Sequence, residues 1–133
     1  MKSRVGYYES LSGPHLRGQG TEAIVTSDFL LRGIPVLVPR YDNTPYDVVV
    51  ELQESFYKIQ IKTAYGGPDT ICFETLSTRA TSSGYERRDY EGLIDYFAIY
   101  SPETDQTYLV HIDEASTGKM VLRLTKPDNN QEV

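Results

Sequence analysis

An acid, an amide and an amine interrupt the segment PYDVVVELQESFYKIQIK, residues 45–62, which is otherwise rich in apolar and aromatic residues. They are Asp47, Gln60 and Lys62. Carboxylate and amide oxygens are hard ligands of the kind that hold Mg²⁺, usually with several water molecules retained. A lysine beside such an ion can orient or help to deprotonate an attacking water, or offset charge that builds up on a phosphate oxygen. Together the three residue types suit metal-assisted hydrolysis of a phosphodiester.

These side chains can act together only if the segment folds into a hairpin with one particular register. A turn centred on Gln53–Glu54 sets Glu51 opposite Phe56, and it sets Asp47 opposite Gln60. Residues directly opposed on antiparallel strands lie within about 5 Å of each other, and diagonal neighbours within about 8 Å. The hairpin therefore predicts that the acid, the amide and the amine converge.

The alternation of side chains along a strand decides which residues share a face. It puts Gln60 and Lys62 on one face and Ile59 and Ile61 on the other. The competing interpretation is that Gln60 and Lys62 belong to the solvated face of an ordinary strand. For Asp47, the competing interpretation is an acid that caps the preceding turn.

A second acid comes from an amphipathic helix predicted in GQGTEAIVTSDFLLRG, residues 18–33, with Gly33 as its C-cap. Glu22 falls in the first turn of this expected helix, next to the apolar face that must pack on a sheet. We expect its carboxylate to reach the edge of the sheet where Asp47 begins a strand. The alternative is that Glu22 merely complements the helix dipole, which favours acids in a first turn without any site.

The remaining segments predict one early helix on a predominantly antiparallel or mixed sheet. A polar arm or partly ordered tail is expected over residues 1–17, the main domain over 18–125, and a tail over 126–133. Residues 78–91 turn polar, which is typical of a loop or a mobile flap. Further strands are expected in IPVLVPR (34–40, buried), ICFETLS (71–77), DYFAIYS (95–101), TYLVHID (107–113) and VLRL (121–124).

Composition limits the function classes. A chain of 133 residues fits one domain with a single core, and no apolar run approaches the length of a membrane span. The single cysteine, Cys72, excludes an internal disulfide framework and a multi-cysteine zinc site. The expected location is cytoplasmic, with no membrane partner.

Charge counts against a protein that binds polyanions without discrimination. Nineteen acids against 13 bases give a net charge of −6 and a sequence pI near 4.8. The bases are unevenly spread, however, and four of them are candidates for phosphate contacts: Arg79, Arg87, Arg88 and Lys58. Three arginines in a polar stretch are equally typical of a solvated surface.

The pattern of Glu22, then Pro45-Tyr46-Asp47, then Gln60-Ile61-Lys62 resembles the PD-(D/E)XK nuclease superfamily. The glutamine in the last motif is similar to that of the group I intron-encoded homing endonucleases, and more remotely the chain resembles archaeal Holliday junction resolvases. The resemblance runs from about residue 18 to about residue 114. The chain departs from the pattern in two ways, because one residue separates Pro45 from Asp47 and because Gln60 replaces the usual acid, which implies weaker metal affinity.

The resemblance implies a fold, a chemistry and partners. The fold is an α/β (α+β) restriction-endonuclease-like core, a central mixed β-sheet in an αβββαβ arrangement flanked by helices. Asp47 would be the central metal ligand, and the Gln60 side chain and the Ile61 carbonyl would be further ligands. Glu22 would bind the metal directly or through water. Lys62 would position the nucleophilic water. The implied cofactor is Mg²⁺, with Mn²⁺ as a substitute.

The expected function is therefore a magnesium-dependent DNA endonuclease of the homing type acting on double-stranded or branched DNA. Recognition of a long target needs more surface than one chain of this size offers, so a homodimer or homotetramer is expected. Two alternatives stay open: a Holliday junction resolvase or repair-type nuclease, and a non-catalytic nucleic-acid-binding module with a nuclease fold. The residue pattern alone does not choose DNA over any other phosphodiester.

Overall fold

The computed structural model describes residues 2–67 and 69–124, except for the side chains of residues 77–81 and 85–88. Two helices precede a run of strands that form one large sheet and two small ones. The elements are α1 (Arg4–Glu9), α2 (Pro14–Leu31), β1 (Val36–Leu37), β2 (Val48–Leu52), β3 (Ser55–Thr63), β4 (Thr70–Glu74), β5 (Leu76–Thr81), β6 (Gly84–Asp89), β7 (Tyr96–Ser101), β8 (Gln106–His111), the 3₁₀ helix η1 (Ile112–Glu114) and β9 (Lys119–Arg123).

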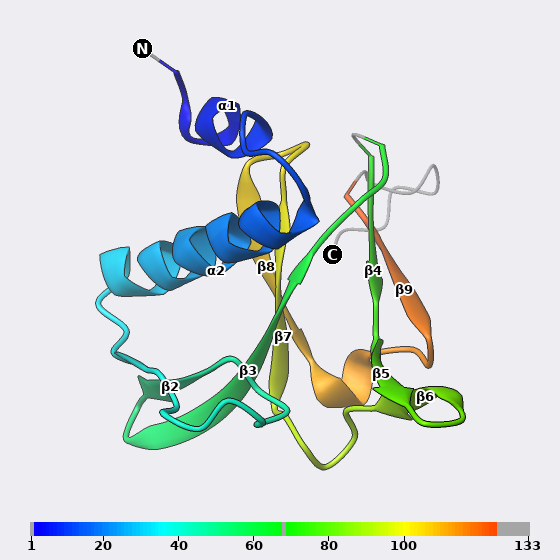
Figure 1. Ribbon diagram of the computed structural model, residues 1–133. Helices are drawn as coiled ribbons and strands as arrows, with labels where there is room; N and C mark the ends of the chain where they lie inside the picture. The colour runs from blue at the N-terminus through cyan, green and yellow to red at the C-terminus, as the bar shows by residue number, and fades with distance from the viewer. Residues whose placement is uncertain (1, 68, 125–133) are drawn as a thin grey trace, which may run out of the picture.

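Three layers make up the molecule. The main sheet has the order β1-β2-β3-β7-β8, in which β3 and β7 are parallel and the other neighbours antiparallel. Helix α2 packs on one face of this sheet, and the β4–β9 pair packs on the other, so that α2 and β4–β9 lie on opposite sides of β3 and β7 (Figure 1). The mixed α+β class expected from the sequence is confirmed. In the described part of the chain, the crossover from β3 to β7 carries β4, β5 and β6 and no α-helix.

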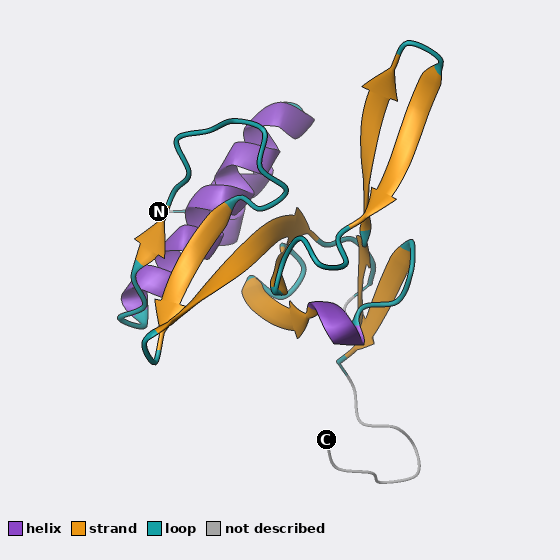
Figure 2. Ribbon diagram, turned by 90° about the horizontal axis from the view of Figure 1, so that it is seen from below, coloured by secondary structure: helices purple, strands orange, loops and turns teal. Residues whose placement is uncertain are grey.

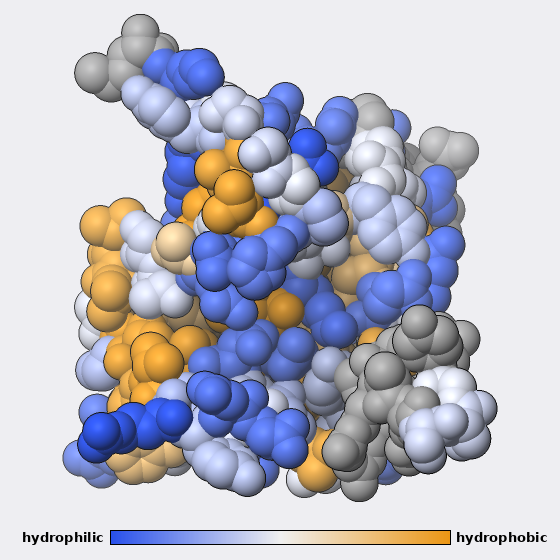
Figure 3. All heavy atoms as spheres, viewed as in Figure 1, coloured by the Kyte–Doolittle hydropathy of each residue, from blue (hydrophilic) through white to orange (hydrophobic). Residues whose placement is uncertain are grey.

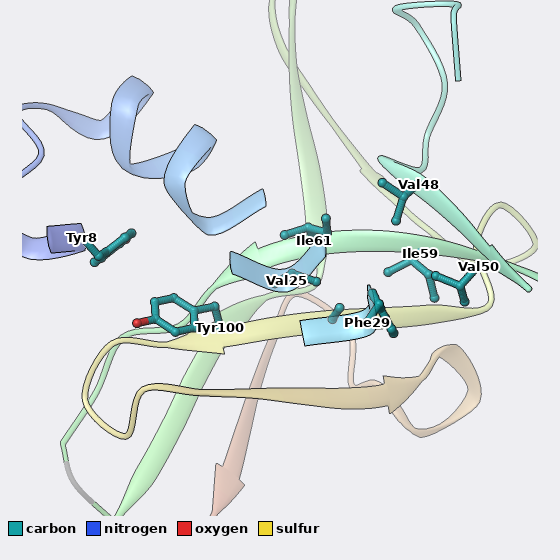
Figure 4. Packing of buried hydrophobic residues seen from close by; sticks show 9 residues of the cluster. Tyr8, Val25, Phe29, Val48, Val50, Ile59, Ile61 and Tyr100 are labelled. Carbon is teal, nitrogen blue, oxygen red and sulfur yellow. The ribbon is translucent and has the colours of Figure 1, made fainter. Parts of the chain in front are cut away.

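The core under α2 follows from a stripe on the helix. Thr21, Val25 and Phe29 recur every fourth residue and are all buried against the sheet. Alternate residues of the strands supply the opposite wall, including Ile59 and Ile61 of β3 (Figure 4). As predicted, these two isoleucines face away from Gln60 and Lys62. The buried members of this cluster are Tyr8, Val25, Phe29, Val48, Val50, Ile59, Ile61, Ala98 and Tyr100.

The end of α2 has the geometry that the sequence predicts for Gly33. This glycine has φ 74°, and its N–H donates to the carbonyl of Leu30 at 3.0 Å. The N–H of Ile34 donates to the carbonyl of Phe29, also at 3.0 Å. This pair of bonds is the Schellman motif, which satisfies the last carbonyl groups of a helix and suits a glycine in the left-handed conformation.

The expected N-terminal arm contains ordered helix instead. Helix α2 begins at Pro14 rather than at residue 18, with Pro at the first helical position where its missing N–H costs nothing. Helix α1 buries Tyr8, whose ring meets Tyr100 edge-on at 5.4 Å between centroids. The guanidinium of Arg4 donates to Asp28 at 2.6 Å and to Asp105 at 2.9 Å. These contacts tie α1 to α2 and to the β7–β8 turn.

Two other sequence expectations need correction. The strand expected to be buried in IPVLVPR is β1, which has only two residues and lies at the edge of the main sheet, with Leu37 45% exposed. The segment 78–91, expected as a loop or flap, mostly forms the β5–β6 hairpin, which projects away from the layers (Figure 2). Hydrogen bonds between the two backbones satisfy such a hairpin whatever its side chains, so a polar composition did not distinguish it from a loop.

The register predicted for the β2–β3 hairpin is confirmed. Glu51 pairs with Phe56 and Val48 with Ile59, which extends to Asp47 beside Gln60. The two-residue turn places Gln53 at φ 52° and Glu54 at φ 66°. Two positive φ values are the signature of a type I′ turn, which matches the twist of the strands but is strained for residues other than Gly, Asn and Asp.

Changing this turn to its preferred residues should stabilise the protein. We expect the double variant Gln53→Asn/Glu54→Gly to raise the free energy of unfolding by about 1 kcal/mol, because Asn and Gly adopt the left-handed conformation with less strain. Urea unfolding followed by circular dichroism measures this. Glu51→Gly, one position inside β2, is the matched control and should lower stability, since a glycine weakens a strand interior. A double variant that is less stable than the parent would contradict the turn assignment.

One part of the surface is apolar. Leu30, Leu31, Leu37 and Val38 are 56%, 80%, 45% and 72% exposed. They come from the end of α2, from β1 and from the residue that follows β1. Apolar side chains gather on this side of the molecule, whereas polar ones cover the middle of the same view (Figure 3). None of the helices described is long and apolar enough to cross a membrane.

Candidate active site

A cleft of about 450 Å³ lies between the first turns of α2 and the strands β2 and β3. Its lining includes Glu22 from α2, Asp47 directly before β2, and Gln60 from β3. The helix is fixed over β3 at this point by a hydrogen bond of 2.7 Å between the hydroxyls of Thr21 and Thr63. Thr21 is 1% exposed and precedes Glu22 directly, so the buried contact sets where the carboxylate of Glu22 emerges.

Asp47 is anchored to β3 by both its backbone and its side chain. Its N–H donates to the carbonyl of Ile59 at 2.8 Å, and its Oδ2 accepts a hydrogen bond from the N–H of Ile61 at 2.8 Å. Burial raises the pKa of Asp47, although the Ile61 N–H and the charge of Lys62 act in the opposite direction. The carboxylate thus faces the neighbouring strand, which the turn-capping interpretation does not account for.

Glu22 lies in the third turn of α2 and not in the first, because the helix starts at Pro14. The effect of the helix dipole is confined to the first turn, so it does not explain an acid at this position. Partial desolvation raises the pKa of Glu22, and the negative charge of Asp47 raises it further. Two carboxylates of the same charge therefore act on each other across the cleft.

Lys62 lies beside these acids on the half-buried face of β3. Its Nζ is 3.4 Å from the hydroxyl oxygen of Tyr90 and 5.1 Å from the centroid of the Tyr90 ring. Burial lowers the pKa of Lys62, and the charges of Asp47 and Glu74 oppose this shift. The face of β3 that carries Lys62 is thus covered by other side chains, unlike the solvated face of an ordinary strand.

The expected phosphate contacts are less defined. The backbone N–H of Lys58 donates to Oδ2 of Asp95 at 2.7 Å, which fixes the start of β3, and by alternation its side chain shares a face with Gln60 and Lys62. Arg79 lies on β5, and Arg87 and Arg88 on β6. The side chains of these three arginines are outside the described part of the structure.

Comparison with known proteins identifies the family to which the chain belongs. A family model described as PD-(D/E)XK endonuclease matches residues 13–133. The chain belongs to this nuclease family. Among solved structures, the bacterial homing endonuclease I-Ssp6803I superposes with a TM-score of 0.72 at 20% sequence identity, over 92% of this chain and 84% of that one. This likeness confirms the restriction-endonuclease-like fold. No curated protein matches the chain.

The oxygen atoms that line the cleft of this PD-(D/E)XK chain suit a hard divalent cation. Among the described residues there is no cluster of three or more His, Cys, Asp or Glu side chains that could hold a metal ion. A site here would depend on the carboxylates of Glu22 and Asp47, the amide oxygen of Gln60 and the carbonyl of Ile61. Mg²⁺ commonly binds through one or two carboxylates and keeps several waters, so this donor set suits it. The repulsion between the half-buried carboxylate of Asp47 and the exposed one of Glu22 also favours a cation between them.

Two further residues that line this cleft were not predicted from the sequence. His15 and Gln19 line it from the first turns of α2, and their side-chain nitrogens lie 3.4 Å apart. His15, Gln19 and Glu22 are spaced i, i+4, i+7, so they share one face of the helix. That spacing was readable in the sequence, but it points to a shared face only once the helix is known to begin at Pro14.

Proposed function

We propose that this PD-(D/E)XK chain is a DNA endonuclease of the homing type that depends on Mg²⁺, with Mn²⁺ as a substitute. The observation that carries the proposal is the meeting of Glu22, Asp47 and Gln60 in one cleft, with Lys62 beside it. The three residues come from separate parts of the chain: α2, the residue directly before β2, and β3. Such convergence is typical of a site and is not required for folding, because two carboxylates that repel each other cost stability.

In this proposal each residue of the cleft would have its own role in the hydrolysis. Glu22, Asp47, Gln60 and the Ile61 carbonyl would hold the cation, which supplies charge to polarise the phosphodiester and stabilise the leaving oxygen. The N–H of Ile61 keeps the Asp47 carboxylate turned toward the cleft. Lys62 would orient the attacking water and offset the charge that develops on the phosphate oxygens. Water attack at phosphorus would leave 5′-phosphate and 3′-hydroxyl ends.

DNA of the homing-target type is proposed because the structural neighbour is described as a bacterial homing endonuclease. Lys58 would contact phosphates from β3, and Arg79, Arg87 and Arg88 would do so from the projecting β5–β6 hairpin. Because the net charge is −6, such local contacts are needed to hold a polyanion.

Assembly into a homodimer or homotetramer is proposed on the same ground of target length. The exposed apolar residues at the end of α2 and on β1 are compatible with a contact between copies. A cytoplasmic location is proposed, since a DNA endonuclease needs access to intracellular DNA.

Purified protein with supercoiled plasmid tests the proposal. We expect nicking in Mg²⁺ or Mn²⁺, and none when EDTA removes divalent ions, because two carboxylates and an amide cannot activate water without a cation. A linear duplex and a four-way junction of the same total length are compared in parallel. Preference for the junction would favour a resolvase, and nicking that persists in EDTA would contradict the assignment of a metal-dependent nuclease.

A further inference from the structure

The amine of Lys62 is held by a buried aromatic residue that the sequence gave no reason to single out. We propose that Tyr90 is a positioning residue that fixes the ammonium group of Lys62 beside the cleft. The proposal rests on the function proposed above, in which Lys62 orients the attacking water. Tyr90 itself would not touch the DNA or the cation, since its side chain is buried in the core cluster under β4 and β9 and does not line the cleft.

The position of the Tyr90 ring is fixed from several directions. Tyr90 is 6% exposed, and its ring meets that of Phe97 edge-on, with 5.4 Å between centroids and 88° between planes. Phe97 is fully buried and pairs with Gln60 across β3 and β7. The carbonyl of Tyr90 also accepts hydrogen bonds from Leu93 at 2.9 Å and Ile94 at 3.3 Å. The ring is therefore a rigid platform built on the same strand pair that carries the site.

Lys62 needs such a platform because its side chain is long and two acids attract it. A lysine side chain carries about 2 kcal/mol of rotamer entropy, so its amine has no preferred position of its own. The ammonium lies within reach of the charges of Asp47 in the cleft and of Glu74 at the end of β4. Glu74 already accepts a hydrogen bond from the hydroxyl of Tyr65 at 3.0 Å, which holds its carboxylate in place. Without a third contact, the amine could move toward Glu74 and away from the cleft.

Tyr90 supplies that third contact in two ways. Its hydroxyl oxygen can accept a hydrogen bond from Nζ at 3.4 Å, and the face of its ring attracts the cation at 5.1 Å from the centroid. Both contacts are neutral, so they orient the ammonium without neutralising it. An ammonium has three N–H donors, and a single bond to Tyr90 leaves two for water or phosphate.

The test separates positioning from a merely structural role by a double-mutant cycle. Single-turnover cleavage of plasmid in Mg²⁺ is measured for Tyr90→Phe, Tyr90→Leu, and each of them combined with Lys62→Met. We expect Tyr90→Phe to slow cleavage about fivefold, and Tyr90→Leu, which also removes the ring, about thirtyfold, with DNA affinity unchanged in both. In the Lys62→Met background neither change should slow cleavage further, since the group that they position is gone.

Tyr108→Phe is the matched control. It removes a hydroxyl that bonds Thr104 at 3.1 Å from a tyrosine packed against the same core cluster. We expect it to cleave at the parental rate. Losses of equal size with and without Lys62 would overturn the proposal, because they would mean that Tyr90 acts through the fold and not through the amine. If Tyr90→Leu does not fold, the comparison of Tyr90→Phe with and without Lys62→Met still tests the proposal.

A second readout does not depend on activity. Lysine labelled with ¹³C at Cε gives one NMR signal for each of the chain's lysines, and Lys62→Arg identifies the Lys62 signal by its absence. The ring current of Tyr90 should shift the Cε protons of Lys62 upfield. This shift should persist in Tyr90→Phe and vanish in Tyr90→Leu. An unchanged signal in Tyr90→Leu would refute the contact, whereas an inactive parent protein with the expected shifts would refute the nuclease function and leave the contact standing.

Discussion

Replacing Asp47 with asparagine should reduce metal-dependent cleavage by at least about a thousandfold, because in the proposed site it exchanges a charged oxygen ligand of the cation for a weaker neutral one. The asparagine side chain can still accept the hydrogen bond from the N–H of Ile61, so the local backbone is preserved. The measurement is nicking of supercoiled plasmid under single-turnover conditions in Mg²⁺. A cleavage rate within tenfold of that of the parent protein would show that Asp47 is not a catalytic residue.

Stability provides a second readout on the same variant. Folding raises the pKa of Asp47, so the folded state favours its protonated form and loses stability as the pH rises through that pKa. Asparagine stays neutral, and in EDTA at neutral pH the variant should be at least as stable as the parent. The rise in Tm on adding Mg²⁺ should disappear, because stabilisation by a ligand depends on its binding to the folded state.

Asp95→Asn is the matched control for this substitution. Asp95 also accepts a hydrogen bond from a backbone N–H of β3, that of Lys58 at 2.7 Å, but it lies at the other end of the strand and does not line the cleft. We expect this variant to keep the Mg²⁺-dependent rise in Tm and most of the cleavage rate. Equal losses in the two variants would indicate that β3, and not the cleft, had been disturbed.

Lys62→Met should slow cleavage by about a hundredfold or more while leaving DNA affinity close to that of the parent. Groups that transfer or position a proton in the transition state typically contribute factors of this size. Methionine keeps an unbranched apolar stem against Tyr90 and removes only the amine. Burial lowers the pKa of Lys62, so loss of its charge should not destabilise the fold. Single-turnover rates at saturating protein, measured beside Kd values in Ca²⁺, separate the chemical step from binding.

Lys58→Met is the control for Lys62→Met, on the same strand and the same face. Lys58 would contact a phosphate outside the cleft, so its loss should raise Kd and reduce the salt dependence of binding, with little change in the saturating rate. If instead both lysine variants lowered the saturating rate equally, Lys62 would have no special part in the reaction.

The local part of the site could be predicted from the sequence because it depends on neighbours along the chain. The β2–β3 hairpin has a two-residue turn and a clear alternation, which fix the register that brings Asp47 to Gln60. The end of α2 at Gly33 was readable for the same reason. Both features rest on backbone rules that act over a few residues.

The features that could not be predicted from the sequence depend on contacts between distant segments of the chain. The pairing of β4 with β9, the burial of Tyr90 against Phe97 and the docking of α1 through Arg4 join residues far apart in the sequence, and no local pattern specifies them. The start of α2 was placed four residues late, although Pro14 marks it, and this put Glu22 in the wrong turn of the helix. The proximity of Glu22 to Asp47 was nevertheless anticipated, because the packing face of the helix fixes it more than the start does.

The connectivity of the main sheet also has a consequence for the order in which the protein folds. The β2–β3 hairpin closes over a two-residue turn, whereas β3 meets β7 only across the whole connection from Thr63 to Tyr96. Closing a long loop costs more entropy than closing a short one, so we expect the hairpin to belong to the folding nucleus and β7 to join after the transition state. The Gln53→Asn/Glu54→Gly variant should then gain its stability as faster refolding, with the unfolding rate unchanged, and stopped-flow kinetics that found slower unfolding instead would place the hairpin late. Asp47 and Gln60 would in that case be aligned in the nascent protein before the aromatic support of Lys62 has assembled.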